Sequence, residues 1–225
     1  MVRIQGVEGV RMETARIKIK TVLVSLVVVV AIELAVVLTV SGGADNLLLI
    51  LCVARLLEVI FIVGTVLILE GDISSIGLFP YRVTSGLKRG FIWSAGFGII
   101  VLLVSAALFA FGINPIKLLH TRLPAGQVEI ALFFLVGGIV SPVAEEVLFR
   151  GVLYGFFRRW GVFAAVTLST LAFVLVHPTG SGVPLPQITG GVLFAMAYEK
   201  EGNLLVPITI HTLGNIAIFS LSLMP

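Results

Sequence analysis

Two adjacent carboxylates and an arginine interrupt an otherwise apolar part of this sequence. Glu145, Glu146 and Arg150 lie between an apolar run at 130–140 and another at 152–157. A charged side chain at membrane depth costs about 2.5–3.5 kcal/mol on insertion scales, so such a residue usually serves a function. On a helix, Glu146 and Arg150 are four residues apart and can pair, whereas Glu145 is rotated by about 100°. We therefore expect one carboxylate to be neutralised and the other to be available for chemistry.

Two further polar pairs follow in the C-terminal half of the chain. Phe173 and His177, and then His211 and Asn215, are each spaced four residues apart, which places both members of a pair on one helix face. Alone, each pair is a weak signal, because a histidine or asparagine in a membrane helix often serves only as a hydrogen-bond clamp. The combination is stronger, because two of the three histidines of the chain lie in apolar segments that follow the Glu-Glu pair.

In order and spacing, these three motifs resemble those of the CAAX protease and bacteriocin-processing family, a family of glutamic-type intramembrane endopeptidases. The resemblance covers about residues 128–219, and the preceding part of the chain fits only through its hydrophobicity. Pro178, directly after the motif histidine, is a small departure, and we expect it to end the helix there and to set the histidine at the rim of a pocket.

The resemblance implies one catalytic site and an endopeptidase that acts on a membrane-anchored protein or peptide without a cofactor. The first glutamate would be the general base and the first histidine would help to hold the attacking water. The second glutamate would pair with the arginine, and the last two residues would donate hydrogen bonds to the oxyanion. The six site residues would be Glu145, Glu146, Arg150, His177, His211 and Asn215.

Other functions remain open at this point. Glu145, His177 and His211 could instead be the ligands of a zinc ion with one open position, although the chain has no His-Glu-x-x-His motif. A transporter could use Glu145 and His177 as a proton relay, but its two halves should then be related by internal symmetry, and the motifs are confined to one half. A non-catalytic immunity or scaffold protein is the third alternative, and the presence of every motif residue argues against it.

Composition defines the fold class. Of 225 residues, 58% are hydrophobic and only 12% are charged, against about 25% charged residues in soluble domains. We therefore predict an all-α polytopic membrane protein that forms a single membrane domain over 1–225 in the lipid bilayer of the cell membrane. The net charge of +3 comes from residues scattered over short loops, which does not favour nucleic-acid binding, and the single Cys52 excludes a disulfide within the chain.

Hydrophobic runs predict about seven transmembrane helices. After a basic lead at 1–20, three spans fall within 21–112 and a motif-bearing core occupies 127–223. A polar connection is expected at 70–90, a kink at Pro142, and close helix packing at Gly90, Gly96 and Gly98. The expected helices are 21–40, 46–69, 91–111, 127–157, 161–177, 186–198 and 204–223.

Charged residues predict the orientation and one buried pair. Segments on the N-terminal side of the alternating helices hold eleven of the fifteen Lys and Arg residues, whereas the opposite loops hold only Lys117 and Arg122. The asymmetry predicts a cytoplasmic N-terminus and an external C-terminus. In the second span, Arg55 and Glu58 are three residues apart, and we expect a structural ion pair that faces the bundle.

Overall fold

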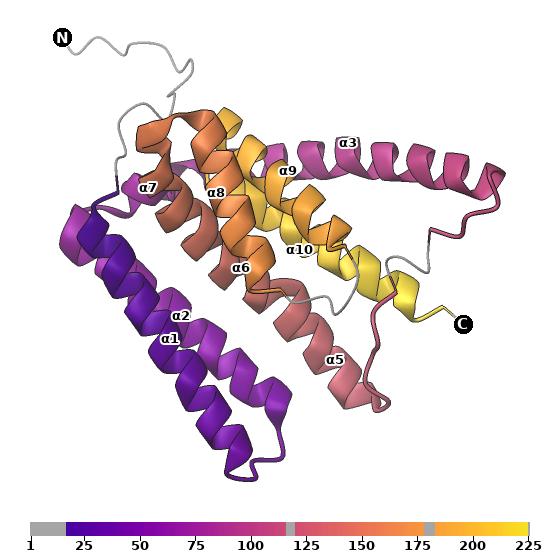
Figure 1. Cartoon of the computed structure of the whole chain (residues 1–225), viewed down its shortest axis with the longest axis horizontal. Coiled ribbons are helices and arrows are strands. Elements are labelled where there is room, and N and C mark those ends of the chain that lie inside the picture. The colour runs from indigo at the N-terminus through magenta and orange to yellow at the C-terminus, as the bar shows by residue number, and fades with distance from the viewer. Residues whose placement is uncertain (1–16, 116–119, 178–182, 225) are drawn as a thin grey trace.

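In the computed structural model, which describes residues 17–115, 120–177 and 183–224, the chain is a helical bundle (Figure 1). The described residues contain no strand, so the all-α prediction is confirmed. Apart from short 3₁₀ turns, seven helical segments follow one another within these residues, which is the number of helices that the sequence predicted. They are α1 (Ile19–Ser41), α2 (Leu47–Glu70), α3 (Val83–Ala110), a continuous segment Gln127–Trp160, α8 (Val162–Leu175), α9 (Leu185–Glu201) and α10 (Leu205–Ser222).

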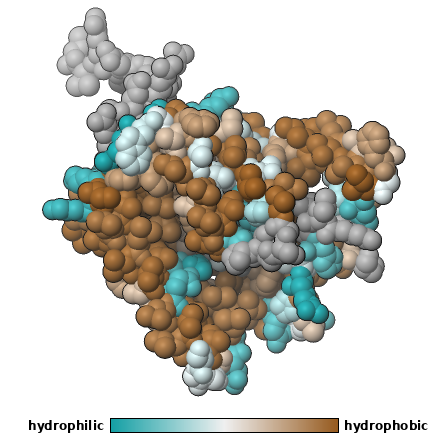
Figure 2. Space-filling view, in the orientation of Figure 1, coloured by the Kyte–Doolittle hydropathy of each residue, from teal (hydrophilic) through white to brown (hydrophobic). Residues whose placement is uncertain are grey.

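Five of these segments are long and apolar enough to cross a membrane: α1, α2, the segment Pro80–Ala110 that includes α3, Gln127–Trp160 and α10. Helix α8 is apolar but has 14 residues, fewer than the about 20 that a full span needs. Helix α9 has 17 residues and ends in Glu199, Lys200 and Glu201. The outside of the bundle is largely hydrophobic (Figure 2), which is the surface that a lipid bilayer covers.

The third span begins earlier than the sequence indicated. The expected polar connection at 70–90 is reduced to two 3₁₀ turns, Ile73–Ile76 and Pro80–Arg82, and α3 starts at Val83. The physical reason lies in two glycines that let the charged first turns of α3 pack against the start of α10. A Cβ atom at Gly86 would lie 2.6 Å from the Asn203 side chain, and one at Gly90 would lie 2.5 Å from Cβ of Thr209.

The two other glycines of α3 do not have the predicted role. A Cβ atom at Gly96 or Gly98 would meet no described atom within 4 Å. The prediction of close packing is therefore confirmed at Gly90 and wrong at Gly96 and Gly98. The reason is that α3 leaves the bundle beyond its first turns, as Figure 1 shows.

The motif-bearing segment Gln127–Trp160 is continuous but is not a uniform α-helix. Two π-helical stretches, Val136–Val140 and Val147–Tyr154, flank the short helix α6 (Ser141–Glu146). Pro142, where we expected a kink, follows directly after the first stretch, and its missing N–H explains why the regular α-helical ladder is interrupted there. The remaining parts are α5 (Gln127–Leu135), α7 (Gly155–Phe157) and a 3₁₀ turn Arg158–Trp160.

Charged and polar groups of distant segments meet at one end of the bundle. The segments that the sequence assigned to the cytoplasmic side lie at this end of the bundle and are joined in pairs by polar contacts. Residues 1–16 of the basic lead lie outside the described residues. The contacts join Lys18 to Glu70 at 2.9 Å, Ile17 to Arg159 at 2.6 Å, Arg158 to Glu199 at 2.8 Å and Arg82 to Glu201 at 3.2 Å.

Glu199 connects the motif-bearing segment to the end of α9. Both carboxylate oxygens accept hydrogen bonds from Arg158, at 2.8 and 2.9 Å, and one also accepts from the Tyr154 hydroxyl at 2.7 Å. Burial raises the pKa of Glu199, but these hydrogen bonds outweigh it, so the pKa lies below its ordinary value. The resulting ion pair fixes α9 beside the motif-bearing segment.

Candidate active site

Glu146 and Arg150 form the predicted pair in the interior of the bundle. Both side chains are fully buried, and Nη1 of Arg150 donates to Oε1 of Glu146 at 3.0 Å. Nη2 donates to the backbone carbonyl of Gly191 in α9 at 3.1 Å. The guanidinium also lies over the rings of Phe173, at 4.8 Å, and Phe194, at 5.2 Å. The arginine therefore connects the motif-bearing segment Gln127–Trp160, called the motif helix below, to α8 and α9.

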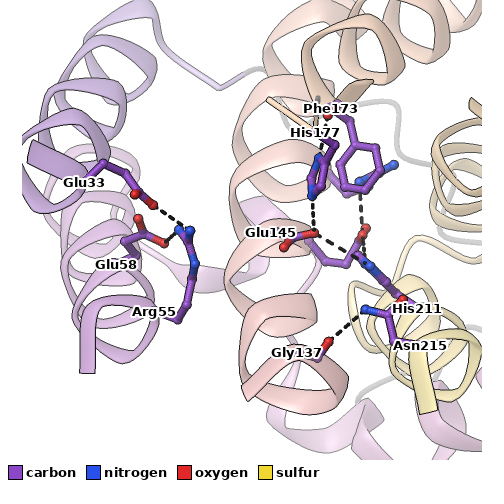
Figure 3. A network of polar contacts seen from close by, with 11 residues as sticks. Glu33, Arg55, Glu58, Gly137, Glu145, Phe173, His177, His211 and Asn215 are labelled. Carbon is purple, nitrogen blue, oxygen red and sulfur yellow. Dashed lines mark hydrogen bonds and ion pairs between the residues drawn. The ribbon is translucent and has the colours of Figure 1, made fainter. Parts of the chain in front are cut away.

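Glu145 lies next to both motif histidines (Figure 3). Its Oε2 atom lies 3.6 Å from Nε2 of His177 and 3.7 Å from Nε2 of His211. These separations are longer than direct hydrogen bonds, and at such distances a bridging water is the usual link. The arrangement gives Glu145 a position from which it can accept a proton from a water held by the two rings.

His177 is oriented by the end of its own helix. Helix α8 ends at Leu175, so the carbonyl groups of its last turn lack partners within the helix. Nδ1 of His177 lies 2.7 Å from the Phe173 carbonyl, which accepts its N–H. The two rings are also packed together, with centroids 4.4 Å apart. Nε2 is thereby directed towards Glu145. Pro178, which we expected to place this histidine at a pocket rim, lies outside the described residues.

His211 links the two glutamates. Its Nδ1 atom lies 2.8 Å from Oε1 of Glu146, and its ring stacks on Phe194 with centroids 4.6 Å apart. Because Oε1 of Glu146 also accepts from Arg150, we assign the ionised carboxylate to Glu146 and the hydrogen to Nδ1 of His211. Nε2 then faces Glu145. Glu146 thus orients the imidazole ring of His211, whose Nε2 atom lies 3.7 Å from Oε2 of Glu145.

Asn215 lies one helical turn beyond His211 on α10 and makes a different contact. Its amide nitrogen donates to the carbonyl of Gly137 at 2.8 Å, within the first π-helical stretch. The structure therefore joins five of the six predicted residues in one polar network and places Asn215 beside it, with one amide N–H committed to the backbone (Figure 3). The sequence carried no signal for the carbonyls of Gly137 and Gly191, because their role depends on which helices become neighbours.

A cavity of about 240 Å³ lies between α1 and α2 on one side and the motif helix on the other. Glu145 and His177 line one wall, and Glu33, Arg55 and Glu58 line the opposite wall. Figure 2 shows a small hydrophilic patch in the hydrophobic surface where these two parts of the bundle meet. The cavity gives Glu145 an open side, and 18% of its side chain is exposed.

The predicted ion pair of the second span is present in this wall and is larger than expected. Arg55 Nη1 lies 2.6 Å from Glu58 Oε2, and Nη2 lies 2.6 Å from Oε1 of Glu33 on α1. The Arg55–Glu58 prediction is confirmed. The third member, Glu33, was visible in the sequence as the only charged residue of the first span, but nothing in the sequence showed that it would reach Arg55.

The zinc alternative concerns Glu145, His177 and His211. Within the described ranges, no group of three or more His, Cys, Asp or Glu side chains forms an arrangement that could hold a metal ion. One oxygen of Glu145 faces the Nε2 atoms of the two histidines. The Nδ1 atoms of the histidines contact the Phe173 carbonyl and the Glu146 carboxylate. A chelation experiment tests metal dependence directly.

The fold and the site define the class of protein: a polytopic membrane protein with a Glu, Glu, Arg, His, His and Asn constellation inside its helices. Residues 127–217 match the family model described as "Type II CAAX prenyl endopeptidase Rce1-like". All six predicted site residues fall in this range. Residues 127–217 are therefore similar to this family of CAAX endopeptidases, in agreement with the resemblance that the motifs indicated.

Three curated relatives are similar to the chain. The membrane-embedded CAAX protease MroQ of Staphylococcus aureus is 35% identical over 106 residues, which cover 43% of this chain and 42% of the relative. The putative membrane peptidase YdiL of Bacillus subtilis is 29% identical over 97 residues, 43% of this chain and 39% of the relative. The UPF0177 protein YxdF of Lactococcus lactis is 30% identical over 91 residues, which cover 40% of this chain and 50% of the relative.

The chain thus spans half or less of the length of each of these relatives. No solved structure gives a significant match.

Proposed function

We propose that this protein is an intramembrane endopeptidase that hydrolyses a peptide bond of a membrane-anchored protein or peptide, with a water activated by Glu145. The observation that carries the proposal is the approach of two histidine Nε2 atoms to one oxygen of Glu145, at the wall of a cavity inside apolar helices. The family match and the peptidase names of two relatives support it.

The chemistry follows from the positions of the three side chains. A water held between Oε2 of Glu145 and Nε2 of His177 would lose a proton to the carboxylate as its oxygen attacks the scissile carbonyl. The carbonyl oxygen becomes an oxyanion. Glu145 then delivers the proton to the departing amine, so that the peptide bond breaks, a carboxylic acid and an amine form, and the enzyme returns to its starting state.

Two donors on α10 would stabilise the oxyanion. Nδ1 of His211 carries the hydrogen that Glu146 accepts, so in the proposed step the ring would donate from Nε2 with a second proton on that atom. Asn215 has a second amide N–H besides the one given to Gly137. Both donors lie on one face of α10 and are positioned by partners on the motif helix.

Replacing either donor should lower turnover more than substrate binding. For His211→Ala and Asn215→Ala we expect kcat to fall by about 10²–10³-fold each, because an oxyanion donor acts mainly in the transition state. Steady-state kinetics on a reconstituted membrane-anchored peptide measures this. Ser220→Ala, which removes only an exposed hydroxyl bonded within α10, is the matched control. A rise in KM at constant kcat would show that these residues position the substrate instead.

We propose that the charged end of the bundle faces the cytoplasm. Glu145 is thirteen residues from Arg158, which amounts to about 20 Å along the helix, so the site would lie in the outer half of the bilayer. Cleavage near the outer end of a transmembrane anchor fits this depth better than cleavage beside a prenylated cysteine. Val183, which is 70% exposed, provides the test as Val183→Cys in a Cys52→Ser background. An impermeant maleimide should label it in intact cells; labelling only in opened cells would invert the orientation.

Proteolysis in the cell can be tested without knowing the substrate. Deletion of the gene should leave at least one membrane protein in its longer form, because the endopeptidase that shortens it is absent. Mass spectrometry of protein termini in membranes from deletion and parent strains detects such a change, and the Glu145→Gln gene should fail to reverse it. A membrane proteome with unchanged termini would contradict the proposed activity.

A further inference from the structure

The wall opposite Glu145 carries more negative than positive charge. Three carboxylates line the cavity, those of Glu33, Glu58 and Glu145, and one guanidinium, that of Arg55. Carboxylates therefore outnumber the guanidinium three to one among the side chains that line the cavity. An uncompensated charge among apolar helices is costly. The cavity is therefore electrostatically matched to a positively charged occupant and repels an anion.

Glu58 supplies a second, independent observation. Its side chain is 97% buried, being only 3% exposed, and Oε2 is held by Arg55. Its other oxygen, Oε1, is buried and has no hydrogen-bond partner among the described residues. Arg55 contacts only the Oε2 atom of this carboxylate, and its other terminal nitrogen contacts Glu33. A buried carboxylate oxygen without a donor is rare in native structures and points to a donor that arrives with a ligand.

We propose that Glu33 and Glu58, held by Arg55, form a subsite that receives a lysine or arginine side chain of the substrate next to the bond that Glu145 attacks. The cavity has room for about eight water molecules, at about 30 Å³ each, which is enough to admit an ammonium group on its aliphatic stem. The stem would pass the apolar lining, which includes Val29 and Ile62. The ammonium would donate to Oε1 of Glu58.

This proposal rests on the proposed endopeptidase function and gives it a specificity. Because Glu145 and the acidic wall share one cavity, a basic residue bound there fixes the position of the neighbouring peptide bond. The same charge excess disfavours a substrate carboxylate in this cavity. A free C-terminal carboxylate would therefore have to lie elsewhere when the bond is cleaved.

The test compares peptides that differ in one ammonium group. Membrane-anchored peptides, identical except for a lysine or a norleucine scanned through the residues beside the anchor, are bound to the full chain in nanodiscs as the Glu145→Gln variant, which does not cleave them. At one or more positions lysine should bind about tenfold more tightly than norleucine, as expected for a hydrogen bond to a charged group. Glu58→Gln in the same background should remove this preference, whereas Glu129→Gln, an exposed change on α5, should leave it intact.

The outcomes distinguish a failure of the proposed subsite from a failure of the proposed endopeptidase function. Equal binding of the lysine and norleucine peptides at every position overturns the subsite. A loss of affinity in Glu58→Gln that is the same for both peptides also overturns it. If Glu58→Gln does not fold, judged by its thermal unfolding, Glu33→Gln at the rim decides, and an unchanged preference overturns the proposal. Lysine-selective binding by a chain whose unmutated form cleaves none of the peptides would support the subsite and refute the endopeptidase. Cleavage without lysine preference would do the reverse.

Discussion

Replacement of Glu145 by glutamine is expected to abolish proteolysis and to leave the protein folded. The amide has the shape of the carboxylate but cannot take a proton from water, and a general base contributes about 10²–10⁴-fold to rate. The fold should survive because the contacts of Glu145 with His177 and His211 are longer than hydrogen bonds, at 3.6 and 3.7 Å. Turnover of a membrane-anchored peptide in liposomes measures the first effect, and thermal unfolding in detergent measures the second.

A control separates the loss of a base from the loss of a charge. Glu129→Gln makes the same chemical change on the exposed side of α5, in the same helical segment, and should keep normal turnover. If Glu145→Gln retained near-normal turnover, the assignment of the general base would be wrong. If Glu145→Gln unfolded, the residue would have a structural role that its contacts do not indicate.

Replacement of Glu146 by glutamine should have the opposite balance and destabilise the protein. Arg150 is fully buried, and in the glutamine variant its charge has no anionic partner, only the neutral oxygens of the new amide and of the Gly191 carbonyl. Removing one partner of a buried ion pair costs about 3–5 kcal/mol. His211 also loses the charge of the carboxylate that orients it, so activity should fall together with stability. The melting temperature and the yield of monodisperse protein after extraction measure the effect.

Two further variants test whether the buried charge is the cause. The double variant Glu146→Gln/Arg150→Met removes both charges and should recover much of the stability, because an apolar replacement leaves no charge buried. Glu199→Gln breaks a pair with Arg158 whose side chains are 26% and 22% exposed, and it should cost less, about 1 kcal/mol or below. A Glu146→Gln variant as stable as the unmodified protein would mean that Arg150 finds another partner.

Much of the architecture follows from local sequence. Hydrophobic length alone located the helices within a few residues, since α1, α2 and α10 begin and end close to the predicted limits. Fixed helical spacing predicted the Glu146–Arg150 and Arg55–Glu58 pairs, because side chains four or three residues apart meet whatever the surroundings are. The site residues could be selected because ionisable groups are rare in such apolar segments.

The remainder depends on contacts between helices and could not be predicted. The early start of α3 requires Gly86 and Gly90 to lie against α10, and no local pattern shows that partner. The hydrogen bond between His211 and Glu146 depends on how α10 packs beside the motif helix. Likewise, the cavity exists only because α1 and α2 place Glu33 and Arg55 opposite Glu145.

Hydrolysis by a glutamate-activated water without a metal can be measured directly in a purified system. The full chain, stripped with a strong chelator and reconstituted in liposomes with a set of membrane-anchored peptides, is assayed by mass spectrometry for new peptide termini. We predict cleavage at an internal peptide bond, with the two product masses summing to the substrate plus one water, and an unchanged rate in the continued presence of the chelator. Cleavage that stops on chelation and returns with Zn²⁺ would contradict this mechanism, and intact peptides under every condition would contradict the endopeptidase itself.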